Sequence, residues 1–271
     1  MKKPDPAGLC LLFPAGKRPT RAALRDFAQA QRAVSLTHDP ADESYIHLVT
    51  PDQPANAAKG TSSVSSEVAD RVWVELLREG LTFDLVGLAP GGACEFPVIE
   101  HRFDLEAVPT AFRSEALHLS PGQHLSGGET SAPVVKGLIG LARDLVHHFA
   151  HLEAAVWPHS QSAIGRRFFE SVSTAWLEGG PFPALGLTAF RETMDRALQS
   201  VGLEFWIGQE LRIEPPLSLD KVAATRLGVR LINHMVTIGG LEDSERIIAP
   251  DGSRLVMRPS QNGKFVRVWP E

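Results

Sequence analysis

Three histidines near the middle of the chain have types and a spacing that could support metal chemistry. His147 and His151 are four residues apart, which on an α-helix places both side chains on one face, as two zinc ligands require. A third ligand would have to come from His159, from Glu153 or from a distant part of the chain. The H-E-x-x-H pattern of zinc peptidases is absent, and the negative end of a helix dipole also favours imidazoles. The metal-ligand candidates are therefore His147, His151 and His159, with a structural role at a helix end as the alternative.

Other reactive side chains lack the neighbours that catalysis requires. No G-x-S-x-G elbow surrounds Ser160 or Ser162, so we expect one of them to cap a helix. No neighbouring charge in the sequence would activate Cys94 as a nucleophile. Glu210 and Glu214 bracket a short strand and should point to the same side of it, either as surface acids or as a glycosidase pair. The sequence therefore identifies no catalytic residue.

Charge and loop composition argue against a nucleic-acid partner. The chain has 27 Lys and Arg against 32 Asp and Glu, a net charge of -5, which disfavours phosphate backbones. Residues 87–92 are glycine-rich and follow a strand, but they match neither G-x-G-x-x-G nor G-x-x-x-x-G-K-[ST]. Residues 246–271 hold five basic and two acidic side chains, which a solvated strand face explains. We therefore consider nucleic-acid binding an unfavoured alternative.

Length and composition are those of a soluble globular protein. The 271 residues are 43% hydrophobic and 22% charged, and two cysteines do not make a disulfide framework. The apolar run at residues 8–13 is too short for a signal-peptide core, and no run approaches the roughly 18 residues that cross a bilayer. We expect a cytoplasmic protein with no membrane partner.

Alternating helix and strand signals predict an α+β fold, with mixed, largely antiparallel sheets packed against about five helices. Helical patterns cover residues 20–32, 67–79, 131–149, 163–178, 193–201 and 220–235. Extended patterns cover residues 8–13, 45–49, 81–88, 152–157, 184–190, 203–207, 211–213 and 265–269, and Asp251-Gly252 predicts a tight hairpin turn. The strand at residues 265–269 shows no clean division into an apolar and a polar face.

The expected organisation is an N-terminal α+β part, residues 1–130, and a C-terminal α+β part, residues 131–271, unless the chain forms one continuous domain. Residues 51–66 lack periodicity and predict a loop. Residues 89–130 are weakly patterned and predict short irregular strands.

Short motifs in the C-terminal part resemble a bacterial family known as domain of unknown function 4261. They are a strand that ends in Trp157 before a helix, the string Gly202-Leu-Glu-Phe-Trp-Ile-Gly208-Gln-Glu-Leu-Arg-Ile213, and the turn Val236-Thr-Ile-Gly-Gly240. The segment Gly208-Gln-Glu210 departs from the Gly-Leu-Pro-Glu-like string that is typical of the family. The resemblance implies a compact α+β fold and transfers neither a catalytic residue nor a cofactor.

The sequence therefore predicts a non-catalytic protein-binding module without a cofactor. This rests on the lack of a complete catalytic signature and on aromatic-rich segments around Trp206 and Trp269, because tryptophan and arginine are the residues that anchor protein interfaces. A tryptophan-rich core would give the same pattern. The alternative function is a hydrolase that uses the His147, His151 and His159 cluster, with a metal if these side chains are ligands.

Overall fold

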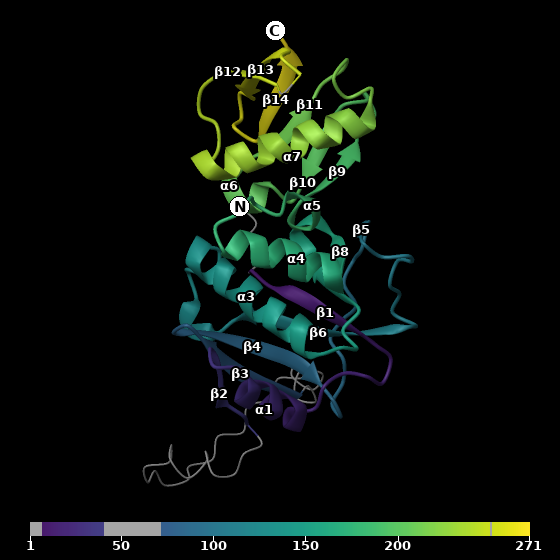
Figure 1. The fold of residues 1–271 in the computed structure, drawn as a ribbon, viewed down its shortest axis with the longest axis vertical. Coiled ribbons are helices and arrows are strands. Elements are labelled where there is room, and N and C mark those ends of the chain that lie inside the picture. Colours follow the sequence, from purple (N-terminus) through teal and green to yellow (C-terminus); the bar gives the residue numbers. More distant parts are fainter. Residues whose placement is uncertain (1–6, 41–71, 250) are drawn as a thin grey trace, which may run out of the picture. The chain divides into compact units, whose positions relative to one another are not determined.

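The computed structural model describes residues 7–40, 72–249 and 251–271 and confirms the α+β fold class (Figure 1). The strand expected at residues 45–49 and the loop at residues 51–66 lie outside these ranges. The chain divides into two compact units. The N-terminal unit comprises residues 1–97 and 109–155, and the C-terminal unit comprises residues 98–108 and 156–271. This division differs from the boundary at residue 130 that the sequence suggested.

The N-terminal unit is built on an antiparallel core of strands. Its elements are β1 (Leu9–Pro14), α1 (Arg21–Ala30), β2 (Val34–His38), β3 (Val72–Arg78), β4 (Leu81–Leu88), β6 (Ser114–Pro121), α3 (Ala132–His148) and the start of β7 (Ala154–Trp157). Within this unit the strand order is β2-β3-β4-β6-β1-β7. Strands β8 (Ser162–Gly165) and β5 (His101–Phe103) belong to the C-terminal unit, where they pair in parallel. Strand β6 shows that residues 89–130 include one long regular strand, contrary to expectation.

The helix expected at residues 67–79 is wrong over its described part, because residues 72–78 form strand β3, and residues 67–71 lie outside the described ranges. Val74 and Leu76 are buried alternately along it, and β3 pairs with β4 in an antiparallel hairpin. Glu79 and Gly80 join the two strands with φ values of 52° and 82°. A two-residue hairpin turn requires this conformation, so Gly80 ends a strand here and not a helix.

Helix α3 is largely buried, as its broad apolar band predicted. Ten of its residues are buried, including Val135, Leu138 and Leu145. The Cβ position of Gly137 lies 3.0 Å from atoms of Leu81 and Phe83, so a glycine there allows α3 to approach β4 closely. No helix in the described ranges is long and apolar enough to span a membrane.

The C-terminal unit contains the second sheet, whose strand order is β12-β13-β14-β11-β10-β9. Its strands are β9 (Ala189–Glu192), β10 (Leu198–Val201), β11 (Glu210–Ile213), β12 (Glu245–Ile248), β13 (Arg254–Pro259) and β14 (Phe265–Pro270). Its helices are α4 (Arg166–Leu177), α5 (Ala184–Leu187), α6 (Glu204–Ile207) and α7 (Lys221–Ile238). Strands β11 and β14 are parallel and the other pairs are antiparallel, so the sheet is mixed.

Residues 184–187, expected to be extended, form helix α5. Two further predictions, on either side of Gly202, are wrong because they exchange helix and strand. Residues 193–201 form a turn followed by β10, because Thr193 and Ala197 are bonded across a turn in which Arg196 has a φ of 63°. Residues 203–207 form the short helix α6, which ends at Gly208 with a φ of 75°. The sequence therefore placed the helix and the strand around Gly202 in the reverse order.

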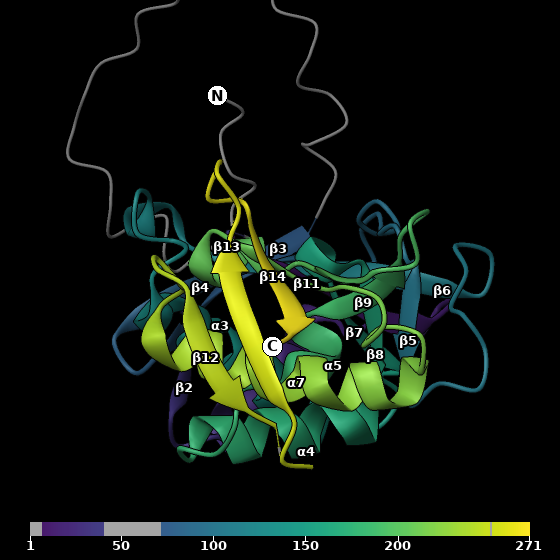
Figure 2. The same cartoon turned by 90° about the horizontal axis from the view of Figure 1, so that it is seen from above.

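The prediction for the last helix and the last hairpin is confirmed, with one change. The Asp220 carboxylate accepts hydrogen bonds from the N–H groups of Val222 and Ala223, which fixes the start of α7. Strands β12 and β13 pair in antiparallel register, with Ile248 opposite Arg254, so the connection is longer than the tight two-residue turn expected. Figure 2 shows β12, β13 and β14 beside one another.

Candidate functional site

Helix α7 packs on one face of the six-stranded sheet of the C-terminal unit, which is formed by β9 to β14. The Cβ position of Gly228 on α7 lies within 2.6 Å of the Phe190 ring and 3.4 Å of Ile213, so only glycine permits this approach. Along β14, Val266 and Val268 are buried, and Phe265, Arg267 and Trp269 alternate with them. Contrary to the sequence interpretation, β14 thus has two distinct faces. The face that carries Arg267 is called the open face below.

Arginines from three adjacent strands stand in one row across the open face. The strand register places Arg258 of β13 and Arg212 of β11 on either side of Arg267. The same row continues through Gln199 of β10 to Arg191 of β9. Like charges directly opposite each other destabilise a sheet, so this row needs acidic partners or an anionic ligand.

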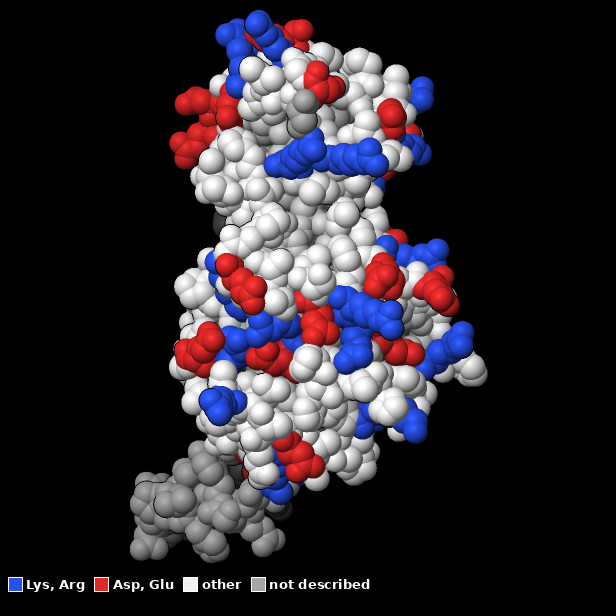
Figure 3. Space-filling view, in the orientation of Figure 1, with Lys and Arg blue, Asp and Glu red and all other residues white. Residues whose placement is uncertain are grey.

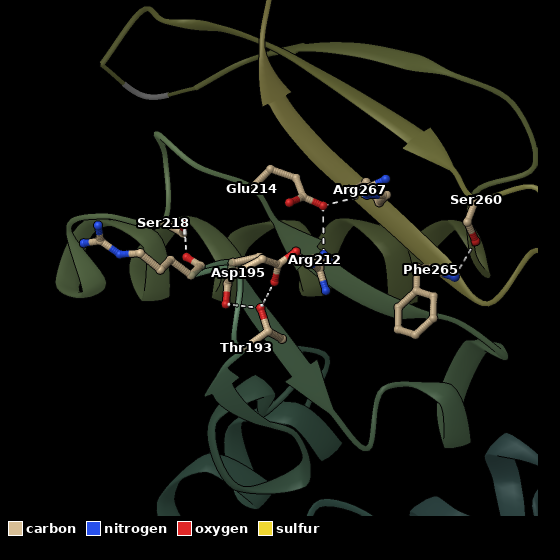
Figure 4. A network of polar contacts seen from close by, with 10 residues as sticks. Thr193, Asp195, Arg212, Glu214, Ser218, Ser260, Phe265 and Arg267 are labelled. Atoms are coloured by element: carbon tan, nitrogen blue, oxygen red, sulfur yellow. Dashed lines mark hydrogen bonds and ion pairs between the residues drawn. The ribbon is translucent and has the colours of Figure 1, made fainter.

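One buried carboxylate lies between two of the three arginines, as Figure 4 shows. The Nε atoms of Arg212 and Arg267 donate to the same oxygen, Oε1 of Glu214, at 2.8 and 2.6 Å. The Glu214 side chain is only 6% exposed. Arg212 also pairs with Asp195, whose pKa is lowered mainly by a hydrogen bond from Thr193 and further by Arg212. Arg212 is therefore neutralised, and Arg267 only in part.

The third arginine is not neutralised in this way. The Arg258 residue is exposed, and its side chain forms no hydrogen bond or ion pair within the described residues. It lines a hollow of about 800 Å³ together with Arg212, Arg267 and two aromatic residues, Phe265 and Trp269. The guanidinium carbon of Arg267 lies 5.0 Å from the centroid of the Trp269 ring, a cation–π contact. The open face thus combines positive charge with aromatic surface.

Glu210, the second carboxylate that the sequence singled out, has a different role from Glu214. It accepts hydrogen bonds from the Gly202 N–H at 2.8 Å, the Glu204 N–H at 3.1 Å and the Ser200 hydroxyl. It therefore holds the start of α6 against β10. Burial raises the pKa of Glu210 above its usual 4.5, although these hydrogen bonds oppose the shift. Glu210 and Glu214 therefore have separate structural partners, and each is explained by the contacts that it makes within the fold.

Replacing Glu210 should reveal this burial in the pH dependence of stability. In Glu210→Gln the amide oxygen can accept the two N–H bonds, and the amide NH₂ can donate to the Ser200 hydroxyl. A raised pKa in the folded state means that the wild type loses stability as the pH rises above 4.5 and the buried carboxyl ionises. We therefore expect urea unfolding to show that, as the pH rises above 4.5, the free energy of unfolding of the wild type falls relative to that of Glu210→Gln.

Two further observations would complete this prediction. Glu210→Ala leaves two backbone N–H groups without an acceptor, so it should cost about 2 kcal/mol at neutral pH. If the free energies of unfolding of the wild type and Glu210→Gln differ by the same amount at every pH, burial does not shift the pKa of Glu210.

The predicted metal ligands are not gathered into a metal site within the described residues. Helix α3 ends at His148, so His147 lies in its last turn and His151 lies beyond the helix; they do not share a helical face as expected. Both are exposed. His159 belongs to the C-terminal unit, where its ring stacks on the Phe205 ring with the ring centroids 4.0 Å apart. Among the described residues no group of three or more His, Cys, Asp or Glu side chains could hold a metal ion.

The candidate nucleophiles are either buried or hydrogen-bonded to the backbone. Helix α4 begins after Gly165, so the expectation that Ser160 or Ser162 caps it is wrong. Ser160 is buried and donates to the Gly186 carbonyl at 2.8 Å. Cys10 and Cys94 are not joined in a disulfide, and burial raises the pKa of Cys10 to about 12, so that thiol stays protonated at neutral pH. The Cys94 thiol donates to the Val86 carbonyl at 3.4 Å.

The two tryptophans that suggested an interface lie in different environments. Trp206 belongs to an aromatic cluster. Its ring stacks on that of Trp157 with the ring centroids 5.6 Å apart, and it contacts the Phe182 ring edge-on with the centroids 4.9 Å apart. Trp157 is 1% exposed and Trp206 is half-buried against it, so ring packing within the C-terminal unit accounts for the segment around Trp206 without an interface. Trp269, in contrast, lines the hollow of the open face.

Sequence reasoning missed the arginine row, although part of its signal was present. The string Phe-Val-Arg-Val-Trp, residues 265–269, alternates valines with the three residues of the open face. The five basic residues at the end of the chain were also noted, as a solvated surface. Arg212, however, lies on β11, and no local pattern indicates that β11 pairs in parallel with β14.

The fold and the site define an α+β protein with an arginine-rich and aromatic sheet face. No family model, no curated protein and no solved structure matches the chain. The resemblance to domain of unknown function 4261 therefore stays a prediction.

Proposed function

We propose that the protein is a cytoplasmic, non-catalytic protein-binding module and that the open face is the surface that contacts the partner. The observation that carries the proposal is the combination, in one hollow, of Arg258, Arg267, Phe265 and Trp269. Arginine and large aromatic residues are enriched at protein interfaces and supply most of their binding energy. Their position on a regular sheet also fits binding, because a sheet holds side chains in a fixed arrangement before the partner arrives.

The proposal can be tested by capturing partners with variants of the open face. Trp269→Ala removes an aromatic anchor, and we expect it to weaken retention of a specific partner by about 30-fold, the effect of losing an interface hot spot. The measurement is quantitative mass spectrometry of proteins retained by the immobilised wild-type chain and its variants from an extract of the source cells.

The matched control is Arg230→Gln on α7, which changes an exposed arginine away from the open face. A partner of the open face should be retained equally by this variant and by the wild type. If every protein captured by the wild type is also captured by Trp269→Ala, the open face is not the binding surface. The proposal would then be rejected.

A further inference from the structure

We infer that the open face recognises an acidic segment of its protein partner, with Arg258 and Arg267 binding carboxylates and Trp269 contacting the adjoining apolar groups. This inference rests on the proposed function, because it specifies the partner of the same surface. Three features of the open face support it: a carboxylate already bound within the row, positive charge left over, and a charge balance that suits carboxylates better than a phosphate backbone.

The first feature is the carboxylate of Glu214. It lies between Arg212 and Arg267 and accepts from the Nε atom of each, at 2.8 and 2.6 Å. The row is therefore spaced so that neighbouring guanidinium groups share one carboxylate. Arg258 and Arg267 face each other across the next pair of strands in the same row. No acidic side chain of the described residues pairs with Arg258, so a partner's carboxylate would contact Arg258 and Arg267 as Glu214 contacts Arg212 and Arg267.

The second feature is the charge that the fold leaves unbalanced. Glu214 is shared between two arginines, and Asp195 pairs with Arg212 only. Arg267 remains 44% exposed, and Arg258 has no acidic partner within the described ranges. Guanidinium groups form paired, directional hydrogen bonds with carboxylates, and these are stronger than bonds between neutral groups. An acidic side chain placed here would relieve the repulsion between cross-strand arginines.

The third feature is the limited extent of the positive charge. Nucleic-acid binding relies on many phosphate contacts and on a field that attracts a long polyanion. The chain has a net charge of -5, and Glu214 and Asp195 lie within the arginine network itself. A short acidic segment needs only a few local contacts, and the aromatic rings of Phe265 and Trp269 provide apolar surface beside them. The open face therefore fits a short acidic protein segment better than a nucleic-acid strand.

The test uses the full chain and a fluorescent peptide of twelve glutamates, with binding measured by anisotropy at low salt. We expect the peptide to bind and the affinity to fall as salt is added, since the contacts are ionic. Arg258→Gln should weaken binding about tenfold, the effect of losing a hydrogen bond to a charged group. The exposed Arg258 side chain forms no hydrogen bond or ion pair within the described residues, so the circular dichroism spectrum of the variant should match that of the wild type.

The matched control is Arg226→Gln on α7, which removes the same charge from the helix. Figure 3 shows basic side chains gathered over α7 as well, so this variant separates general charge attraction from the arginine row. Equal weakening by Arg226→Gln and Arg258→Gln would overturn the inference. So would tighter binding of a single-stranded oligonucleotide of the same net charge, or no binding of the peptide.

The inference and the proposed function can fail separately. If the peptide does not bind but Trp269→Ala still abolishes capture of a cellular partner, the open face is an interface for a partner of other chemistry. If neither the peptide nor any cellular protein depends on the open face, both statements are wrong.

Discussion

Replacing Trp157 with alanine is expected to lower the free energy of unfolding of the C-terminal unit by about 4 kcal/mol. The Trp157 side chain is 1% exposed. Its ring meets that of Phe205 edge-on at 5.3 Å and stacks on that of Trp206 at 5.6 Å. Removing the indole therefore leaves a cavity between two aromatic side chains, which a small rearrangement cannot fill. Urea unfolding followed by circular dichroism measures the loss.

Two control variants make this prediction specific. Trp157→Phe keeps a ring in the cluster, and the indole N–H that it removes has no hydrogen-bond partner in the described structure, so we expect less than half of the alanine effect. Trp269→Ala makes the same substitution on the open face, where it should change binding far more than stability. A loss below about 1 kcal/mol for Trp157→Ala would show that the aromatic cluster is not part of the packed core.

Replacing Glu214 with alanine is the second change expected to have a large effect. It leaves Arg212 and Arg267 adjacent in the sheet without the carboxylate that both contact. Removing one member of a buried ionic group exposes the remaining charges to each other in a poorly solvated site. We expect a loss of about 3 kcal/mol in the free energy of unfolding, measured at neutral pH.

The control for Glu214→Ala is Glu192→Ala. Glu192 pairs with Lys221 at 2.6 Å, but both side chains are well exposed, so solvent screens the pair and we expect no measurable change. The loss in free energy of unfolding for Glu214→Gln should lie between those for Glu214→Ala and Glu192→Ala, because an amide oxygen can still accept a hydrogen bond but carries no charge. Equal effects for Glu214→Ala and Glu192→Ala would show that Glu214 does not neutralise the arginine row.

The elements predicted correctly are those whose sequence pattern fits only one kind of secondary structure. The apolar band of α3 is too long and broad for a strand, and α7 carries its own N-cap at Asp220. Residues 72–78 were predicted wrongly because Val72, Trp73, Leu76 and Leu77 also fit one side of a helix. The pairing of β3 with β4 decides between these possibilities, and that pairing is a tertiary contact.

The candidate site residues were also difficult to predict from local sequence patterns. Sequence spacing brought His147 and His151 together on an expected helix, but α3 ends at His148 and separates them. The arginine row was not predicted because its members come from β11, β13 and β14, and only the strand register aligns them. Spacing along the chain predicts neighbours within a single helix or strand, whereas neighbours across strands depend on how those strands pair.

The sequence by itself determined the α+β fold class, the buried helix α3 and the capped helix α7, whereas the two faces of β14 became clear only in the structure. The features that the sequence determined are local properties, because they follow from the period of apolar residues and from capping side chains within a few residues. The tertiary structure alone decided that β11 lies parallel to β14, that Glu214 joins two arginines and that Arg258 has no acidic partner within the described residues. The physical reason is that strand pairing depends on the burial of apolar side chains from distant segments against α7, and this places the charged residues of the opposite face beside one another.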